Sequence, residues 1–264
     1  MPRHLATGHL RIVSLAPNAT SILCALGARS SLVGVTRWCA DVAPVTRLPK
    51  FGDCWNLESI PRILKLEPDL VIGSVPFKAE TLGKLLEQPV RFLALNPRSL
   101  FDIEADIRVV AGMVGCELAA ARVIAKMRKE FAKIRSRSRG KKRLRVYCEA
   151  WPNPRITSPP WVAELMAICG AEFVSTPGVR ISEEDVAAAN PDIIILAWAA
   201  TGDRAKPEKC YQVASWKEVA AIKNRRVFVI KDELLNTPAP ILTRGARQLA
   251  KVLSIGNRQL MRHP

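Results

Sequence analysis

The stretch NPDIIILAW, residues 190–198, is the most informative about the fold, because an earlier stretch has the same pattern of a turn followed by an apolar run. EPDLVIGS, residues 67–74, also enters an apolar run through a turn that contains proline and aspartate. A strand whose apolar residues are continuous rather than alternating is buried on both faces, which is typical of a parallel sheet covered by helices. The same turn and buried strand, 123 residues apart, therefore indicate two α/β lobes of similar topology.

Strand-like and helix-like segments alternate on both sides of these two stretches. The expected strands are 10–15, 31–35, 69–74 and 90–95, then 143–150, 192–198 and 226–230. The expected helices are 18–27, 57–66, 78–87, 160–170, 182–190, 215–222 and 240–253. Three strand-and-helix groups recur in the same order with loops of different length, which supports a duplicated architecture.

The segment between the two sets has a helical pattern. Apolar residues at 103, 107, 110, 114 and 118 recur at spacings of three and four, and no proline occurs from 99 to 137. We expect one long linking helix, with a break near Gly112–Gly115 left open. The expected domains are an N-terminal α/β lobe (1–98), a linker helix with a basic end (99–140) and a C-terminal α/β lobe (141–264). Parallel sheets bind ligands beyond the carboxyl ends of their strands, so two facing lobes would share one cleft.

Composition narrows the class of protein. The 264 residues are 48% apolar, enough for a packed core, and the formal net charge is +16. Residues 126–145 carry eleven Lys and Arg and one acid, so the positive charge is mostly local. Seven scattered cysteines form neither a disulfide framework nor a zinc motif, and the three histidines lie near the chain ends. We therefore expect no metal site and no catalytic residues, and none of the common nucleotide-binding or hydrolase motifs occurs.

Targeting signals are not visible either. No apolar run has the length of a membrane helix, and no secretory leader precedes the first strand. The chain is therefore either cytoplasmic or lacks its leader.

Tryptophan is the informative residue type. Four tryptophans are expected in or beside loops that follow strands, a fifth lies just inside a helix after a strand, and Trp216 is expected in the core. Aromatic walls with few charges suit a large, flat and largely neutral ligand. The first five are Trp38, Trp55, Trp151, Trp198 and Trp161.

These motifs resemble a known family. RIVSLAPNATSILCALGA, LVGVTRWCADVAP, NLESIPRILKLEPDLVIGS, SPPWVAELMAICGAE and VFVIKDELLNTPAPIL are similar to the substrate-binding proteins of ABC importers for cobalamin and iron–siderophores. The resemblance covers residues 10 to about 253 and is closest to the cobalamin-binding branch of this helix-linked class. It implies two Rossmann-like lobes with parallel sheets, joined by one long α-helix, with the ligand cleft between the lobes.

The resemblance also implies a function and partners. The expected protein is a non-catalytic, monomeric and periplasmic carrier without a membrane span. It carries cobalamin or a related corrinoid as cargo, has no resident cofactor, and docks on a permease dimer. The residues that we predict to bind ligand are Pro17, Arg37, Trp38, Trp55, Phe77, Trp151, Trp161, Trp198, Leu235 and Asn236. Glu80 and Glu233 are the acids that the resemblance implies for transporter docking, and Ser21 stands where many relatives have Glu.

Four alternatives remain open. A ferric siderophore or haem would recruit arginines near the cleft, with Arg37, Arg155 and Arg204 as candidates. A cytosolic corrinoid-handling protein would explain the absent leader. Nucleic-acid binding through residues 126–145 is less favoured, because a basic helix end is usually a solvated face. Attraction of the same segment to anionic lipid headgroups is equally open.

Overall fold

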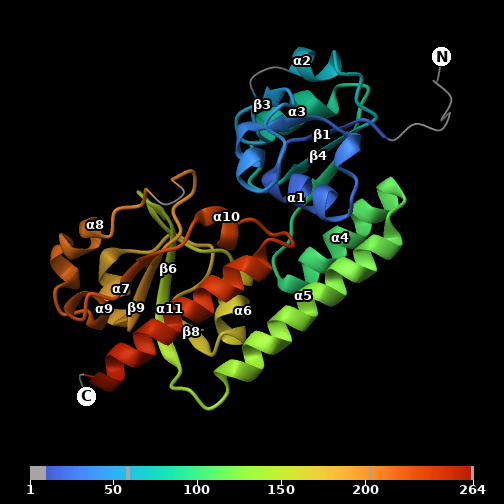
Figure 1. The fold of residues 1–264 in the computed structure, drawn as a ribbon. Helices are drawn as coiled ribbons and strands as arrows, with labels where there is room; N and C mark the ends of the chain where they lie inside the picture. The colour runs from blue at the N-terminus through green and yellow to red at the C-terminus, as the bar shows by residue number, and fades with distance from the viewer. Residues whose placement is uncertain (1–9, 58–59, 202–203, 263–264) are drawn as a thin grey trace. The chain divides into compact units, whose positions relative to one another are not determined.

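The computed structural model of the chain describes residues 10–57, 60–201 and 204–262 (Figure 1). The chain divides into two compact units. The N-terminal unit comprises residues 1–97 and 101–125, and the C-terminal unit comprises residues 98–100 and 126–264. Within the described ranges each unit contains a five-stranded sheet.

The sheet of the N-terminal unit has the order β3-β2-β1-β4-β5, and all its described pairings are parallel. Every residue of β4 is buried, as its continuous apolar run predicts. The strands are β1 (Ile12–Ser14), β2 (Leu32–Thr36), β3 (Lys50–Phe51), β4 (Leu70–Ser74) and β5 (Arg91–Leu95). The helices are α1 (Pro17–Ala25), α2 (Ile60–Leu64), α3 (Ala79–Leu86) and α4 (Leu100–Val114), with 3₁₀ turns at Arg29–Ser31 and Arg37–Asp41.

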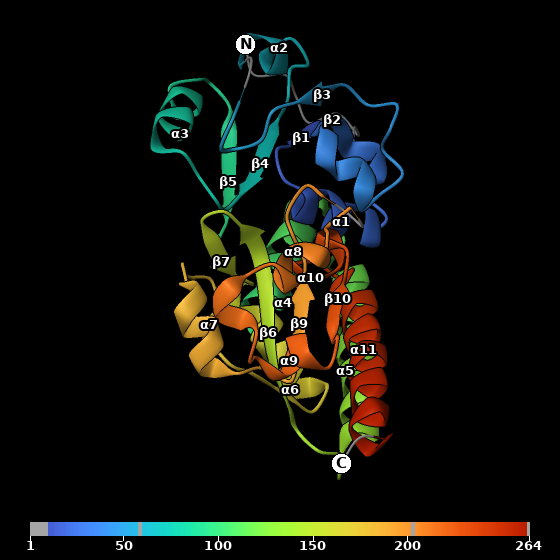
Figure 2. The ribbon, with the colours of Figure 1, turned by 90° about the vertical axis from the view of Figure 1, so that its left-hand side faces the viewer.

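The sheet of the C-terminal unit is centred on β6. Figure 2 shows β7, β6, β9 and β10 in that order across the unit, and β8 pairs with β6 as well. The strands are β6 (Leu144–Pro152), β7 (Arg155–Thr157), β8 (Ala171–Phe173), β9 (Ile193–Leu196) and β10 (Val227–Val229). The helices are α6 (Pro160–Ile168), α7 (Glu183–Ala189), α8 (Glu208–Tyr211), α9 (Ala220–Lys223), α10 (Asp232–Leu235) and α11 (Leu242–Arg262), and a 3₁₀ turn spans Ala214–Trp216.

The duplicated proline-aspartate turn makes the same hydrogen bonds in both sheets. Asp69 Oδ2 accepts a hydrogen bond from the backbone N–H of Arg11 at 2.8 Å, and Asp192 Oδ2 accepts one from Arg145 N–H at 2.9 Å. The N–H groups of the two aspartates donate back to the carbonyls of the same two arginines, each at 2.8 Å. The residue before each proline has a positive φ, 44° and 40°. Each turn thus fixes where the buried strand begins relative to its neighbour.

The duplication extends to the strand order. The N-terminal sheet contains the sequence of neighbours β2-β1-β4-β5, and the C-terminal sheet contains β8-β6-β9-β10 with the same parallel pairings. The prediction of two α/β lobes with Rossmann-like parallel sheets is therefore confirmed. The sheets differ at their margins, where β3 and β7 have no equivalent among the described residues of the other unit.

The linking segment forms two helices where the sequence predicts one. Helix α4 ends at Val114, and α5 (Glu117–Ser138) begins after a turn of two residues. Gly115 has a φ of 66°, a conformation that commonly ends a helix because glycine has no Cβ to clash. The N–H of Cys116 then donates to Ala111 O at 2.9 Å. The break falls at the glycines where the sequence left it open, and the boundary between the units lies within α5.

A second difference concerns residues 215–222, for which the sequence predicts a helix. The structure has the 3₁₀ turn Ala214–Trp216 followed by the short α9. Trp216 is fully buried and its Nε1 donates to Glu183 O at 2.9 Å, while Val219 is extended. Anchoring of this indole in the core overrides the local helical preference.

The remaining differences are smaller. Strand β7 runs antiparallel to β6, so the C-terminal sheet is not wholly parallel. Both β7 and β8 have three residues, too few to show a period in the sequence. Residues 58–59 of the expected helix 57–66 lie outside the described residues, and α11 continues to Arg262 rather than ending at residue 253. Within the described ranges, none of the helices combines the length and apolar character needed to span a bilayer.

Candidate functional site

Five predicted residues follow the strands of the N-terminal sheet. Pro17 begins α1 just after β1, and Arg37 and Trp38 come directly after β2. Trp55 lies four residues beyond β3, and Phe77 lies three residues beyond β4. These strands are parallel, so their carboxyl ends lie at one edge of the sheet. We call this the N-terminal edge, and the structure brings all five residues to it.

Trp55 is the most exposed tryptophan at the N-terminal edge. Its side chain is 57% exposed, although its backbone is held in place. Asp53 Oδ1 accepts hydrogen bonds from the N–H groups of Trp55 at 3.0 Å and Asn56 at 2.9 Å, an aspartate turn that fixes the loop. Single exposed apolar side chains are common on protein surfaces, so Trp55 is informative together with the other aromatic residues at this edge.

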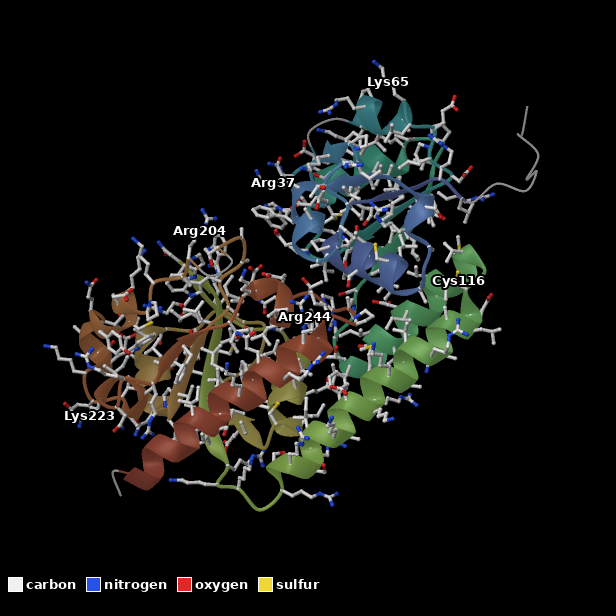
Figure 3. The ribbon with its side chains drawn as sticks, viewed as in Figure 1. Arg37, Lys65, Cys116, Arg204, Lys223 and Arg244 are labelled. Atoms are coloured by element: carbon white, nitrogen blue, oxygen red, sulfur yellow. The ribbon has the colours of Figure 1, made fainter. Side chains whose placement is uncertain are left out.

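Arg37 and Trp38 form a stacked pair. The guanidinium carbon lies 4.4 Å from the centre of the indole, a cation–π distance. Arg37 is exposed and Trp38 is half-buried (Figure 3). Phe77 is also half-buried, but it packs edge-on against Phe92 at 6.3 Å between ring centres and belongs to the core of the unit. The tryptophans therefore supply most of the open aromatic surface here.

Four predicted residues lie at the corresponding edge of the C-terminal sheet. Trp151 lies near the end of β6, and Trp198 follows β9 by two residues. Leu235 ends α10, the short helix after β10, and Asn236 follows it. Strands β6, β9 and β10 are parallel, so these residues follow carboxyl ends of one sheet, which we call the C-terminal edge.

A buried carboxylate holds Trp198. Glu149 is fully buried, and its Oε1 accepts a hydrogen bond from Trp198 Nε1 at 2.8 Å. Its Oε2 accepts from Tyr147 OH at 2.6 Å and from Arg155 Nη1 at 2.9 Å. Arg155 Nη2 also donates to Glu183 Oε1 at 2.9 Å. Trp198 is only 5% exposed, so this cluster fixes its indole inside the unit rather than presenting it to a ligand.

The sequence analysis did not identify Glu149. The available signal is a single acid within the apolar run VYCEAW, since a buried acid is almost always paired. Burial, and next the negative charge of Glu149, raise the pKa of Tyr147 above its ordinary value. The phenol therefore stays protonated and remains a hydrogen-bond donor to the carboxylate.

Trp161 is enclosed in the same unit. It is 5% exposed, and its Nε1 donates to Leu235 O at 2.8 Å, which ties α6 to α10. Leu235 itself is fully buried. Asn236 Nδ2 donates to Ala197 O at 2.7 Å, while its Oδ1 is buried without a hydrogen-bond partner among the described residues. These contacts position the segment after β10 and leave Trp161 and Leu235 little surface for a ligand.

Trp151 differs from the other two tryptophans at the C-terminal edge. It is 41% exposed, and its Nε1 donates to Asn153 O at 2.9 Å. Of the five tryptophans predicted to bind ligand, the structure leaves three with accessible surface and encloses two. The accessible ones are Trp38, Trp55 and Trp151, and the enclosed ones are Trp161 and Trp198.

The three candidate arginines differ in their exposure and in their hydrogen-bond partners. Arg155 is committed to two carboxylates and stacks on Trp216 at 4.5 Å from the ring centre. Arg204 is exposed, with Nε donating to Thr201 O at 3.2 Å (Figure 3). Arg37 is exposed at the N-terminal edge. Arg37 and Arg204 therefore remain as cations with solvent-facing surface.

The two acids implied for transporter docking lie on short helices that follow strands. Glu80 is in the first turn of α3 and is exposed, with Lys84 Nζ at 2.6 Å and Lys78 Nζ at 3.4 Å. The hydrogen bond from Lys84 is the main cause that lowers the pKa of Glu80. Glu233 is in the first turn of α10 and is half-buried. Glu80 is thus the more accessible of the two anions.

Across the described ranges, no group of three or more His, Cys, Asp or Glu side chains is placed to hold a metal ion. All seven cysteines are free, and five of them are buried. Burial raises the pKa of Cys54 to about 11, which keeps that thiol, close to the N-terminal edge, protonated and unreactive at neutral pH.

Known proteins with similar sequences are binding proteins. An uncharacterized ABC transporter substrate-binding lipoprotein of Bacillus subtilis is 26% identical over 254 residues, covering 91% of this chain and 79% of that protein. A vitamin B12-binding protein of Pectobacterium carotovorum is 26% identical over 257 residues, covering 92% of this chain and 88% of that protein.

Solved structures with a similar fold bind more than one ligand. The periplasmic vitamin B12-binding protein of Vibrio cholerae superposes with a TM-score of 0.74 at 22% identity, covering 94% of this chain and 98% of that one. A periplasmic haem-binding protein of Roseiflexus superposes with a TM-score of 0.81 at 24% identity, covering 95% and 100%. At these identities the likeness concerns the fold. The family model described as periplasmic binding protein matches residues 12–234, and the chain therefore belongs to the periplasmic binding protein family.

Proposed function

We propose that this chain is a non-catalytic substrate-binding protein that carries cobalamin or a related corrinoid to an ABC importer. Membership of the periplasmic binding protein family supports the binding role, and sequence relatives named vitamin B12-binding proteins support the ligand class. The observation that carries the proposal is the N-terminal edge, where Trp38 and Trp55 present aromatic surface at the carboxyl ends of parallel strands.

The chemistry of this edge fits a large, flat and weakly charged ligand. If Trp38 and Trp55 buried roughly 200 Å² against a ligand, the gross gain would be about 5 kcal/mol at ~25 cal/mol per Å². Association itself costs on the order of 4–15 kcal/mol, so the two rings alone do not give tight binding. We therefore propose further contacts from Pro17 and Phe77 at the same edge, where both are half-buried. Trp151 is proposed as an aromatic contact at the C-terminal edge.

The enclosed residues have a different place in the proposal. We propose that four residues support the C-terminal edge without contacting ligand, because their hydrogen bonds are made within their own unit. They are Trp161, Trp198, Leu235 and Asn236. A ligand that touched Trp198 directly would first have to displace the indole from Glu149, which would leave a buried carboxylate short of a donor.

A second candidate ligand is haem or a ferric siderophore. The specific observation in its favour is the exposed guanidinium of Arg37 above Trp38, which offers a cation beside an aromatic face. Carboxylate groups of an anionic ligand would pair with such a cation through charge-assisted hydrogen bonds. Arg155 does not add to this reading, because it is held by Glu149 and Glu183.

A ligand panel tests the proposal. Purified protein is titrated with cyanocobalamin, cobinamide, haem and a ferric siderophore while tryptophan fluorescence and the thermal midpoint are followed. Binding of a corrinoid should quench fluorescence and stabilise the fold by about 2.7 kcal/mol at a hundredfold excess over Kd. A response to haem or siderophore alone would replace the corrinoid with the second candidate, and no response to any of the four would overturn the proposal.

We further propose a periplasmic location and docking on the importer's permease through Glu80 and Glu233. The relatives are described as a lipoprotein and as vitamin B12-binding proteins, which agrees with a carrier outside the cytoplasm. Replacing Glu80 with Arg should weaken binding to the purified importer while ligand affinity stays unchanged. Replacing Glu87, an exposed acid at the end of α3, with Arg is the matched control and should leave docking intact.

A further inference from the structure

The positive charge of the chain is concentrated on two segments of the C-terminal unit. Residues 126–145 hold eleven Lys and Arg with one acid, Glu130, and residues 242–262 hold five with no acid. The second half of α5 and helix α11 lie side by side in both views (Figures 1 and 2), and Arg247 Nε lies 3.8 Å from Glu130 Oε2. We call the exposed Lys and Arg of 126–145, with Arg244, Arg247 and Lys251, the basic face.

A cavity of about 330 Å³ opens within this basic face, beneath the last turns of α5 and the middle of α11. Four cations line it: Arg137 and Lys141 from α5 and the following loop, and Arg247 and Lys251 from α11. Apolar side chains that include Ile134 and Leu253 also line it, and there is no acid among its described lining residues. The cavity therefore combines an apolar floor with a cationic rim.

The uncharged polar groups of the cavity are largely occupied by the protein itself. Ser138 Oγ donates a hydrogen bond to Ile168 O at 3.1 Å, and Cys169 Sγ donates one to Ala246 O at 3.4 Å. These groups tie α5 and α11 to α6 and offer little to a neutral polar ligand. Recognition of a ligand's polar part is left to the four cations, and the rest of the ligand must suit Ile134 and Leu253. An anion with an apolar body meets both conditions.

Size and composition favour a lipid over a nucleic acid. The volume lies at the lower end of small-molecule sites and admits a headgroup but not a duplex. Single-stranded nucleic acid is usually bound by stacking on aromatic rings, and the described lining contains none. Exposed Lys and Arg around the opening suit the negative potential of a membrane that contains anionic lipid.

We propose that the basic face docks on membranes containing anionic phospholipid, with one headgroup seated in the cavity. The lipid phosphate lies among Arg137, Lys141, Arg247 and Lys251, and the adjoining apolar part contacts Ile134 and Leu253. This surface is separate from the C-terminal edge, since it lies at the side of the sheet where β6 begins, with Leu144 in its lining. The proposal does not depend on which ligand the protein carries.

Co-flotation with vesicles tests this proposal. The full chain is mixed with vesicles of phosphatidylcholine alone, or of phosphatidylcholine with phosphatidylglycerol, at physiological salt. The protein should float only with the anionic vesicles. The variant Arg247→Gln/Lys251→Gln should lower the partition coefficient by more than roughly thirty-fold, because two basic residues near an anionic surface contribute about 1 kcal/mol each and these two would also contact the seated phosphate directly.

Two matched variants separate a seated headgroup from bare charge attraction. Arg135→Gln/Lys142→Gln removes the same charge from exposed positions of the basic face that do not line the cavity, and should lower the partition coefficient much less. Ala250→Leu keeps the charge but fills the apolar floor, and should weaken flotation while the thermal midpoint shows an intact fold.

Three results would overturn the proposal. The first is no flotation with anionic vesicles. The second is an equal loss for both charge variants with no effect of Ala250→Leu. The third is that the protein binds duplex DNA but not vesicles, and that Arg247→Gln/Lys251→Gln weakens the DNA binding. This result would show that the basic face binds nucleic acid.

Discussion

The two sheets share a strand order but differ in the exposure of the tryptophans near their carboxyl ends. At the N-terminal edge Trp55 is 57% exposed, whereas in the C-terminal unit Trp198 and Trp161 are each 5% exposed and Trp151 stays open at 41%. Trp55 and Trp198 both follow parallel strands, so position in the fold does not explain their difference. Both enclosed indoles donate their N–H to an acceptor in their own unit, as a buried tryptophan requires.

A single position illustrates this point. Strand registers equate Leu15, just after β1, with Glu149 in β6, since Ser14 pairs with Ile72 and Cys148 pairs with Ile195. Both positions are buried, at 1% and 0% exposure. Leucine offers no acceptor, whereas the carboxylate draws in an indole, a phenol and a guanidinium. This acid therefore accounts for the enclosure of Trp198, whereas Trp161 is held by a backbone carbonyl instead.

The largest effect on stability is expected when Glu149 is replaced by leucine, the residue at the equivalent position of the N-terminal sheet. Glu149→Leu leaves Arg155 without its buried partner and Trp198 without its acceptor, so we expect a loss of about 3–5 kcal/mol in the free energy of unfolding. Urea unfolding measures it. The matched control is Glu183→Ala, which removes the other and more exposed partner of Arg155 and should cost less than about 1 kcal/mol. Equal costs would show that Glu149 has no special role.

An intermediate effect is expected from removing one indole N–H at each edge. Trp161→Phe leaves Leu235 O buried without its donor and should lower the free energy of unfolding by about 1–3 kcal/mol. Trp55→Phe, its counterpart at the exposed edge, should stay within about 0.5 kcal/mol of the wild type. Thermal and urea unfolding of the two variants measure these losses. Equal losses in the free energy of unfolding would contradict the comparison.

The smallest effect concerns pH and the N-terminal unit. Burial, and next the charge of Asp102, raise the pKa of Asp106 in α4 from 3.8 to about 6. Because the folded protein holds this proton more tightly, the contribution of Asp106 to stability is fully present below pH 3.8 and is lost progressively as pH rises to about 6. Asp106→Asn should therefore raise the thermal midpoint more at pH 8 than at pH 5, where only part of the contribution has been lost.

The pH prediction has its own control. Glu87→Gln neutralises an exposed carboxylate at the end of α3 and should leave the difference between pH 5 and pH 8 unchanged. A similar shift in both variants would mean that net charge, and not burial of Asp106, sets the pH response.

Much of the fold follows from patterns visible in the sequence. The continuous apolar runs located β4 and β9, and the shared turn correctly indicated two equivalent sheets. Position after a strand was enough to bring residues such as Trp38 and Trp55 to one edge. Short elements such as β7 were missed because three residues show no period.

The burial of individual tryptophans could not be predicted in the same way. Whether Trp198 is open or enclosed depends on Glu149, which is 49 residues away in the chain, and Trp161 depends on a backbone carbonyl 74 residues away. Such contacts exist only once the strands have paired. The break at Gly115 was foreseen only as an option, because a glycine within a helical pattern is compatible with both outcomes.

The most direct test of the account is a calorimetric titration of cyanocobalamin into the wild type, Trp38→Ala/Trp55→Ala and Phe101→Ala. Phe101 is 71% exposed on α4 and serves as the control for loss of an exposed ring. We expect the double variant to bind at least tenfold more weakly, since about 1.4 kcal/mol corresponds to a factor of ten, while Phe101→Ala binds like the wild type. Unchanged affinity in the double variant would contradict the claim that the open indoles of the N-terminal edge hold the ligand.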